Sequence, residues 1–196
     1  MVERMFGSNP RARGDLTPGA LYAIAGHSGW VYYGQINVDK CVVLIRRRDR
    51  SVAEPDDILG SQPMSVVCFA YRSIGRAMRA GIWKKLGRFP MGRYLAVRPR
   101  TVQWSARATT VTVWDHEKPL YDTSAYDPEI QDLEIMAVWD AEEHIKDRLI
   151  TDFGVEDPVW HVTGPIWRER RVREERARRS PDAPWAALPD DWEFTP

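Results

Sequence analysis

The chain of 196 residues is 43% hydrophobic, which is enough for a domain with a buried core. Its 28 basic and 28 acidic residues cancel, which argues against a chain that binds nucleic acid through a strong net positive charge. No run of roughly 18 apolar residues is present, and the N-terminal residues lack the apolar stretch of a secretory signal. We therefore predict a cytoplasmic protein without a membrane span.

The N-terminal half predicts a β-meander. Residues 1–17 are polar and are expected to form a flexible arm. Four segments rich in β-branched and aromatic residues are expected to be strands: residues 20–26, 30–38, 41–48 and 64–71. Gly34 interrupts the second strand, which indicates a bulge or a close backbone approach. A helical turn is expected at residues 56–59, and the strands together predict a strongly bent sheet or a small open barrel.

The stretch 73–90, SIGRAMRAGIWKKLGRFP, is the segment around which we expect the fold to be organised. Ile74 and Met78 lie four residues apart and would share one face of a short helix. Gly81 stands where a left-handed C-terminal cap is expected. Trp83 follows at once and would bury a large aromatic surface where the chain leaves the helix.

The next segments predict more strands than helices. One or two short strands are expected within residues 93–104, and residues 108–115 alternate most clearly between apolar and polar side chains. Residues 116–128 are expected to form a turn and a loop. Residues 129–139 fit either a strand or a helix.

The C-terminal part predicts two helices. The first covers residues 140–153, with Asp140 as its N-cap, and a last short strand is expected at residues 159–165. The second covers residues 167–179, which are almost entirely charged. A helix of that kind is unstable alone, so the tail at residues 180–196 is expected to fold back onto the body or to stay partly disordered.

These segments predict an α+β fold with a mostly antiparallel, strongly bent sheet and two or three helices. Residues 1–17 would form the arm, residues 18–166 a single domain, and residues 167–196 a charged helix with a proline- and tryptophan-rich tail. In the folded-back alternative, Trp185 or Trp192 would contact the body.

Charge is distributed unevenly along the chain. Residues 58–114 contain ten Lys or Arg and no acid, whereas residues 115–143 contain ten acids and one base, Lys118. In one interpretation the two blocks fold against each other and partly neutralise. In the other they form a surface that steers a charged partner.

The two cysteines, Cys41 and Cys68, each lie in an apolar run and lack CxxC spacing. This pattern favours two reduced thiols in the core. A disulfide and a metal site are the less favoured alternatives, because two cysteines do not complete a zinc site without several histidines.

No pattern of an active site is present. His144 follows Asp140 by four residues, a spacing that places two ligand-type side chains on one helical face but that also arises by chance on charged helices. Gly-rich phosphate loops, GxSxG and HExxH motifs are absent from the sequence. We predict that the protein is not an enzyme and has no cofactor and no metal.

The alternative of a nucleic-acid-binding or regulatory module depends on basic residues among aromatic ones. Arginines cluster at residues 46–50, and all the charged residues within 72–107 are basic. Such regions bind single strands through phosphates and base stacking. The neutral overall charge makes this the second hypothesis.

Two motifs, PGALYAIAGHSGWVYYGQI and AGIWKKLGRFP, lie within residues 18–90, and through them this segment resembles the Imm26-type family of bacterial immunity proteins. The opening PGALYAIAGHSGWVYYGQI resembles the family's first hairpin, and AGIWKKLGRFP resembles its G-x-W-x-x-x-G-x-x-P segment after a short helix. The positions that match are Gly19, Ala23, Ile24, Tyr33, Gly34, Ile36, Gly81, Trp83, Gly87 and Pro90.

The resemblance implies a non-enzymatic inhibitor that binds and neutralises a cognate secreted toxin of a polymorphic toxin system and so protects the producer and its siblings. A cognate toxin domain would be the partner, and the protein would be a monomer or a homodimer. Many toxin domains that attack nucleic acids are basic, so we place the contact in the acidic block. The candidate residues are Asp122, Asp127, Glu129, Asp132 and Glu134.

Overall fold

A computed structural model describes residues 5–92, 100–105, 107–153 and 165–195. Contacts between residues divide the chain into two compact units. The described residues of the first unit are 5–92 and 137–153. Those of the second unit lie between 100 and 136 and between 165 and 195.

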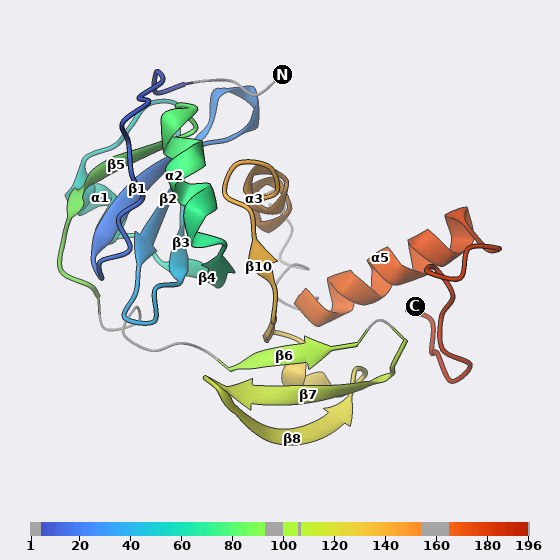
Figure 1. The fold of residues 1–196 in the computed structure, drawn as a ribbon. Coiled ribbons are helices and arrows are strands. Elements are labelled where there is room, and N and C mark those ends of the chain that lie inside the picture. The colour runs from blue at the N-terminus through green and yellow to red at the C-terminus, as the bar shows by residue number, and fades with distance from the viewer. Residues whose placement is uncertain (1–4, 93–99, 106, 154–164, 196) are drawn as a thin grey trace. The chain divides into compact units, whose positions relative to one another are not determined.

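The first unit contains a six-stranded sheet with the order β10-β4-β3-β2-β1-β5 (Figure 1). Neighbouring strands are antiparallel except for the parallel pair β10 and β4. The strands are β1 (Ala20–Ala25), β2 (Val31–Ile36), β3 (Val42–Asp49), β4 (Pro63–Phe69), β5 (Trp83–Arg88) and β10 (Val138–Trp139). The sheet curls into a half-barrel, as the sequence predicts.

Both faces of strand β1 are buried, because its alternate side chains enter two different cores. Tyr22 and Ile24 pack in a cluster that includes residues of α2 (Tyr71–Arg79) and α3 (Ile145–Phe153). Leu21 and Ala23 pack in a second cluster with Ile58 of α1 (Pro55–Leu59). Strand β1 therefore reads as one continuous apolar run in the sequence, as expected for a strand covered on both sides.

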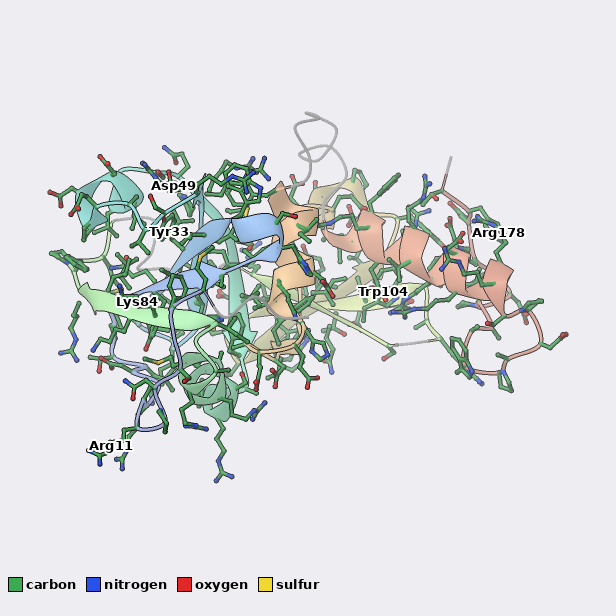
Figure 2. The ribbon with its side chains drawn as sticks, turned by 90° about the horizontal axis from the view of Figure 1, so that it is seen from above. Arg11, Tyr33, Asp49, Lys84, Trp104 and Arg178 are labelled. Atoms are coloured by element: carbon green, nitrogen blue, oxygen red, sulfur yellow. The ribbon has the colours of Figure 1, made fainter. Side chains whose placement is uncertain are left out.

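Gly34 of β2 marks the close approach that its position in the strand predicts. A Cβ at this residue would lie 2.6 Å from Cγ1 of Val42 on β3. The register of β2 against β3 also shifts at Tyr32 and Tyr33. The Tyr33 hydroxyl donates a hydrogen bond of 2.9 Å to Asp49 at the end of β3, and Figure 2 shows the two residues beside each other.

The central stretch around Trp83 folds as predicted. Helix α2 ends at Arg79, and Gly81 has a φ of +74°. The N–H of Ile82 donates to the carbonyl of Ala77, which is the bonding pattern of a Schellman cap. Trp83 is 1% exposed and packs edge-on against Phe69, with ring centroids 5.4 Å apart.

Residues 5–17, which we expect to be a loose arm, contact the first unit in this structure. Phe6 donates to the carbonyl of Gly81, and Asn9 donates to that of Arg79. Asp15 accepts a hydrogen bond of 2.5 Å from Lys85 of β5.

The second unit contains a four-stranded sheet with the order β8-β7-β6-β9. Its elements are β6 (Thr101–Trp104), β7 (Thr110–Asp115), β8 (Lys118–Ser124), η3 (Pro128–Ile130), β9 (Glu134–Ile135) and α5 (Pro165–Arg179). The core includes Val102, Val111 and Val113 from the sheet and Ile166 from α5. Because α5 supplies this apolar residue, its otherwise charged sequence is anchored to the sheet.

The tail returns to the second unit through Trp192. Its ring is 8% exposed and stacks on Trp104 at a centroid distance of 6.0 Å, and its Nε1 donates to Glu174 of α5. Trp185, the other tryptophan of the tail, is 70% exposed.

The α+β class and the mostly antiparallel arrangement are confirmed. Among the described residues there are ten strands in two sheets and four α-helices, of which α1 is little more than one turn. The sequence analysis places residues 18–166 in one domain, whereas the structure divides them between the two units. The chain leaves the first sheet after β5, forms the second sheet, and returns as β10 beside β4.

Two local expectations differ from the structure, one open alternative is decided by it, and two expected strands lie at least partly outside the described residues. Strand β8 forms where a turn and loop are expected at residues 116–128. Helix α3 begins at Ile145, and Asp140 instead caps the preceding turn by accepting from the N–H of Glu142. Residues 129–139 form the short strands β9 and β10 and no α-helix. The strands expected over residues 93–99 and 159–164 lie outside the described residues.

Candidate functional site

The acidic block of the sequence is divided by the fold. Its last three acids, Asp140, Glu142 and Glu143, belong to the first unit. Asp140 and Glu142 accept hydrogen bonds from Arg76 of α2, at 2.5 Å and 3.2 Å. These two acids are therefore partly neutralised by a member of the basic block, and only residues 115–136 remain together in the second unit.

The β7–β8 hairpin is the most exposed part of that remainder. The two strands pair from Thr110 opposite Ser124 to Asp115 opposite Lys118, with a register shift near Trp114. Every residue of β8 is exposed except Thr123, which is half-buried. Because β8 pairs only with β7 in the described sheet, its other backbone edge faces no strand there.

Asp122 lies on the outer face of this hairpin. It stands opposite Thr112, whose hydroxyl donates a hydrogen bond of 2.7 Å to the carboxylate. The neighbouring residues Val111 and Val113 point into the core, so the alternation of β7 places Thr112 and Asp122 on the opposite face. Beside Asp122 in the chain, Leu120 and Tyr121 are 37% and 43% exposed.

Asp127 has a structural role that the sequence analysis does not assign to it. Its carboxylate accepts hydrogen bonds from the Thr123 hydroxyl at 2.7 Å and from the N–H of Glu129 at 2.9 Å. It therefore caps η3 and ties it to the end of β8. The same hydrogen bonds, with that of Thr123 the strongest, lower the pKa of Asp127.

Glu129 and Asp132 follow on the same segment and are exposed. Neither makes an ion pair or a side-chain acceptor bond with a described residue. They are the two predicted acids that are best placed to meet a partner.

Glu134 is separated from the others by the fold. It lies on β9, which is the opposite edge of the sheet from β8. Strand β9 packs against α5, a helix with seven arginines. Glu134 is half-buried and already has an interaction within the chain, so it is the least suited of the five candidates.

We give the name acidic edge to five exposed residues, three on β8 and two on the segment after it: Leu120, Tyr121, Asp122, Glu129 and Asp132. On β8 it has a strand edge without a partner in the described sheet, two exposed apolar side chains and the carboxylate of Asp122, and the following segment adds two exposed carboxylates. Such a surface has the physical features needed to bind a protein with a basic and partly apolar surface.

The basic block at residues 72–107 is less available than its sequence indicates. Lys85 and Arg88 of β5 both face Asp15, at 2.5 Å and 3.4 Å, and Arg76 is paired as described above. The hydrogen bond from Lys85 is the main reason that the pKa of Asp15 is well below its ordinary value. Several cations of the block thus take part in holding the first unit together.

The arginines at the end of β3 also have partners inside the first unit. Arg47 donates to Asp49 at 2.8 Å, and this bond lowers the pKa of Asp49. The guanidinium groups of Arg48 and Arg50 lie 4.6 Å and 3.7 Å from the ring centre of Trp30. A nucleic acid base that stacked on Trp30 would have to displace these cations.

The described residues contain no group of three or more His, Cys, Asp or Glu side chains that could hold a metal ion. Within the same part of the chain, no helix combines the length and the apolar composition that crossing a membrane requires.

Sequence reasoning missed two features. The sequence analysis expects a turn and a loop where β8 forms, although the alternating strand β7 needs a partner and Tyr121 and Thr123 have strand propensity. The second feature is the contact between Cys41 and Cys68, for which the sequence analysis favours two reduced core thiols over a disulfide. Their Sγ atoms lie 2.7 Å apart.

Comparison with protein-family models found no match, and neither the curated proteins nor the solved structures contain a significant match to this chain. The resemblance to Imm26-type immunity proteins therefore stays a prediction from the sequence.

Proposed function

We propose that this protein neutralises a cognate toxin domain by binding it through the acidic edge. The observation that carries the proposal is the exposure of β8, where a strand edge that is open in the described sheet, two apolar side chains and the carboxylate of Asp122 occur together. An open edge accepts a strand of a partner by backbone hydrogen bonds, and neighbouring side chains provide the specificity.

The residues that carry the resemblance support a model in which the first unit maintains the fold and the second unit recognises the partner. Gly19 and Gly81 have φ values of +89° and +74°, and Trp83 is fully enclosed. These residues are needed for turns and for the core of the first unit. Recognition of a particular partner would then depend on other residues, and the acidic edge lies in the second unit.

Complementary charge would set the rate and specificity of binding more than its strength. Exposed ion pairs contribute about 0.2–1 kcal/mol each, so the burial of Leu120 and Tyr121 would have to supply much of the affinity. Carboxylates on the rim would guide a basic partner to the surface. An acidic partner would be repelled from it.

The first experiment is co-expression with the products of neighbouring reading frames in the producing bacterium. The expected result is that one neighbour arrests growth when expressed alone, and that this protein restores growth and forms a stoichiometric complex with it. If no neighbour is toxic or none is neutralised, the immunity function is wrong.

The second experiment tests the surface. The double variant Glu129→Lys and Asp132→Lys should weaken the complex by about tenfold or more at low salt, because two attractions become repulsions. The difference from the wild type should shrink as salt screens the charges. Asp182→Lys is the matched control, because Asp182 is exposed in the same unit and lies outside the acidic edge.

A further variant, Leu120→Ser with Tyr121→Ser, removes the apolar part and should raise the dissociation rate. Unchanged affinity in both variants would exclude the acidic edge as the contact, even if the protein neutralises the toxin. If the purified protein instead shifts labelled RNA or DNA with a steep salt dependence, the nucleic-acid hypothesis replaces the present one.

A further inference from the structure

The two cysteines of the chain meet across neighbouring strands of the first unit. Cys41 immediately precedes β3 and is 2% exposed, whereas Cys68 lies on β4 and is half-buried. They are 27 residues apart in sequence, and their sulfur atoms are 2.7 Å apart. Both are thiols in this structure.

The backbone holds the two residues in facing positions. Val42 of β3 stands opposite Val67 of β4 in the antiparallel register. One step further along, Cys41 comes opposite Cys68. Directly opposed residues of antiparallel strands have Cα atoms about 4.5–5.5 Å apart, which lies within the range of about 4.4–6.8 Å that a disulfide spans.

The turn before Cys41 fixes that residue further. The side-chain oxygen of Asn37 accepts the N–H of Cys41 at 2.9 Å, and the N–H of Asn37 donates to the carbonyl of Cys41 at 2.9 Å. Cys68 is held from the other side, because β4 pairs with both β3 and β10. The two thiols are therefore positioned by the fold and need no large movement to react.

We propose that Cys41 and Cys68 form a reversible redox pair that closes to an intramolecular disulfide. The oxidant is a small-molecule disulfide of the glutathione type. The thiolate of the more exposed Cys68 attacks one sulfur of the oxidant, which forms a mixed disulfide and releases one reduced thiol. The thiolate of Cys41 then attacks the Cys68 sulfur and releases the second reduced thiol.

In balance, the two protein thiols are oxidised to one disulfide, and one oxidised glutathione is reduced to two molecules of glutathione. The half-buried sulfur meets the oxidant and the buried sulfur resolves the adduct, an arrangement typical of redox-responsive cysteine pairs. In a reducing compartment the pair stays as thiols, which is the state that the sequence analysis favours.

The disulfide would act as a staple on the first unit. It would close a loop that contains β3, α1 and most of β4, and closure of a loop of this length restricts the unfolded chain strongly. For a unit of this size we expect the Tm to rise by about 10 °C on oxidation.

The test uses the full-length protein equilibrated in buffers of increasing oxidised to reduced glutathione ratio. The expected product is a monomer that has lost two hydrogen atoms by intact mass and has no reactive thiol after denaturation. Its Tm should rise as stated and return to the starting value after reduction. The variant with both cysteines replaced by alanine should show no Tm change under the same buffers.

Two single variants separate the roles of the thiols. Cys41→Ala should accumulate a stable glutathione adduct on Cys68, because no resolving thiol remains. Cys68→Ala should react much more slowly, because Cys41 is buried. Circular dichroism and the Tm of the reduced variants establish that both are folded.

Three outcomes would overturn the proposal. The first is a wild-type chain that keeps two thiols at every ratio. The second is a wild-type chain that stops at the glutathione adduct or forms a disulfide-linked dimer. The third is an intramolecular disulfide that leaves the Tm unchanged, which would remove the staple.

Discussion

Trp83 should be the residue whose replacement best reveals what holds the first unit together. Its indole N–H donates a hydrogen bond of 3.0 Å to the carbonyl of Ala141, which is fully buried. The N–H of Ala141 in turn donates to the hydroxyl of Ser73 at 2.9 Å. The segment before α3 is therefore clamped from both sides by α2 and β5.

The informative change is Trp83→Phe. It leaves the carbonyl of Ala141 buried without its donor, which costs about 1–3 kcal/mol. It also removes one ring from a site enclosed by Tyr22 and Phe69, which costs about 1–2 kcal/mol more. We expect the free energy of unfolding to fall by about 2–5 kcal/mol.

Trp83→Ala would remove far more volume and approach the whole stability of a typical domain, so it is expected to unfold the unit. Ser73→Ala removes the other half of the clamp. Because both side chains hold the backbone of the same residue, Ala141, one through its N–H and the other through its carbonyl, their effects should be non-additive by at least about 0.5 kcal/mol.

The measurements are urea denaturation followed by far-ultraviolet circular dichroism and hydrogen exchange of the amides of α3. In Trp83→Phe, exchange in α3 should accelerate together with that of β5. A loss below about 0.5 kcal/mol would refute the assigned hydrogen bond, since an unsatisfied buried carbonyl costs more. Additive effects with Ser73→Ala would refute the clamp.

Three other changes test separate parts of the structure. Gly81→Ala should lower the free energy of unfolding by about 1–3 kcal/mol and expose residues 5–17 to proteases, because φ is +74° and the new Cβ would meet the carbonyl of Gly7 at 2.6 Å. Burial raises the pKa of Tyr22 to about 12. The stability that this shift provides is complete below pH 10 and is lost as pH rises towards 12, so Tyr22→Phe should flatten the fall in Tm between these values. Glu174→Gln should loosen the tail and shift the fluorescence of Trp192 to the red, because the 4% exposed carboxylate accepts from Trp192; an unchanged spectrum would contradict this role.

The sequence predicts the first unit well because local signals there agree with the tertiary packing. Gly81 and Trp83 follow a short amphipathic helix, and each has the conformation or the burial that its residue type requires. The strands around Gly34 are apolar on both faces, so burial reinforces their propensity.

The second unit is harder to predict at its edge strand β8, because this strand is exposed. In β8 both faces meet solvent, so the alternation that identifies a half-buried strand is absent. Pro119 also argues for a loop when the strand is considered alone. Pairing with β7 decides the outcome, and Pro119 is tolerated because it lies at the register shift of an edge strand.

The cysteine pair shows a different limit of prediction from the sequence. Cys41 and Cys68 each have an apolar neighbourhood in the sequence, and this correctly predicts that Cys41 is buried. Their contact depends on the register of β3 against β4. A register shift of one residue between β3 and β4 would move the side chains of one strand to the other face of the sheet. No pattern within either segment specifies which residue of the other strand lies opposite each cysteine.

Among the described residues, the two charge blocks meet only in part, through the ion pairs that Arg76 makes with Asp140 and Glu142. Arg76 and Asp140 lie 64 residues apart and form an ion pair, whereas Glu134, only six residues before Asp140, belongs to the other unit. A run of like charges in a sequence is thus no guarantee of a continuous surface. Reversal of Asp140 would remove a turn cap and an ion pair of the first unit, so a loss of binding in such a variant would report on folding. Reversal of Glu129 and Asp132 avoids this confusion, because neither carboxylate accepts a bond from a described residue.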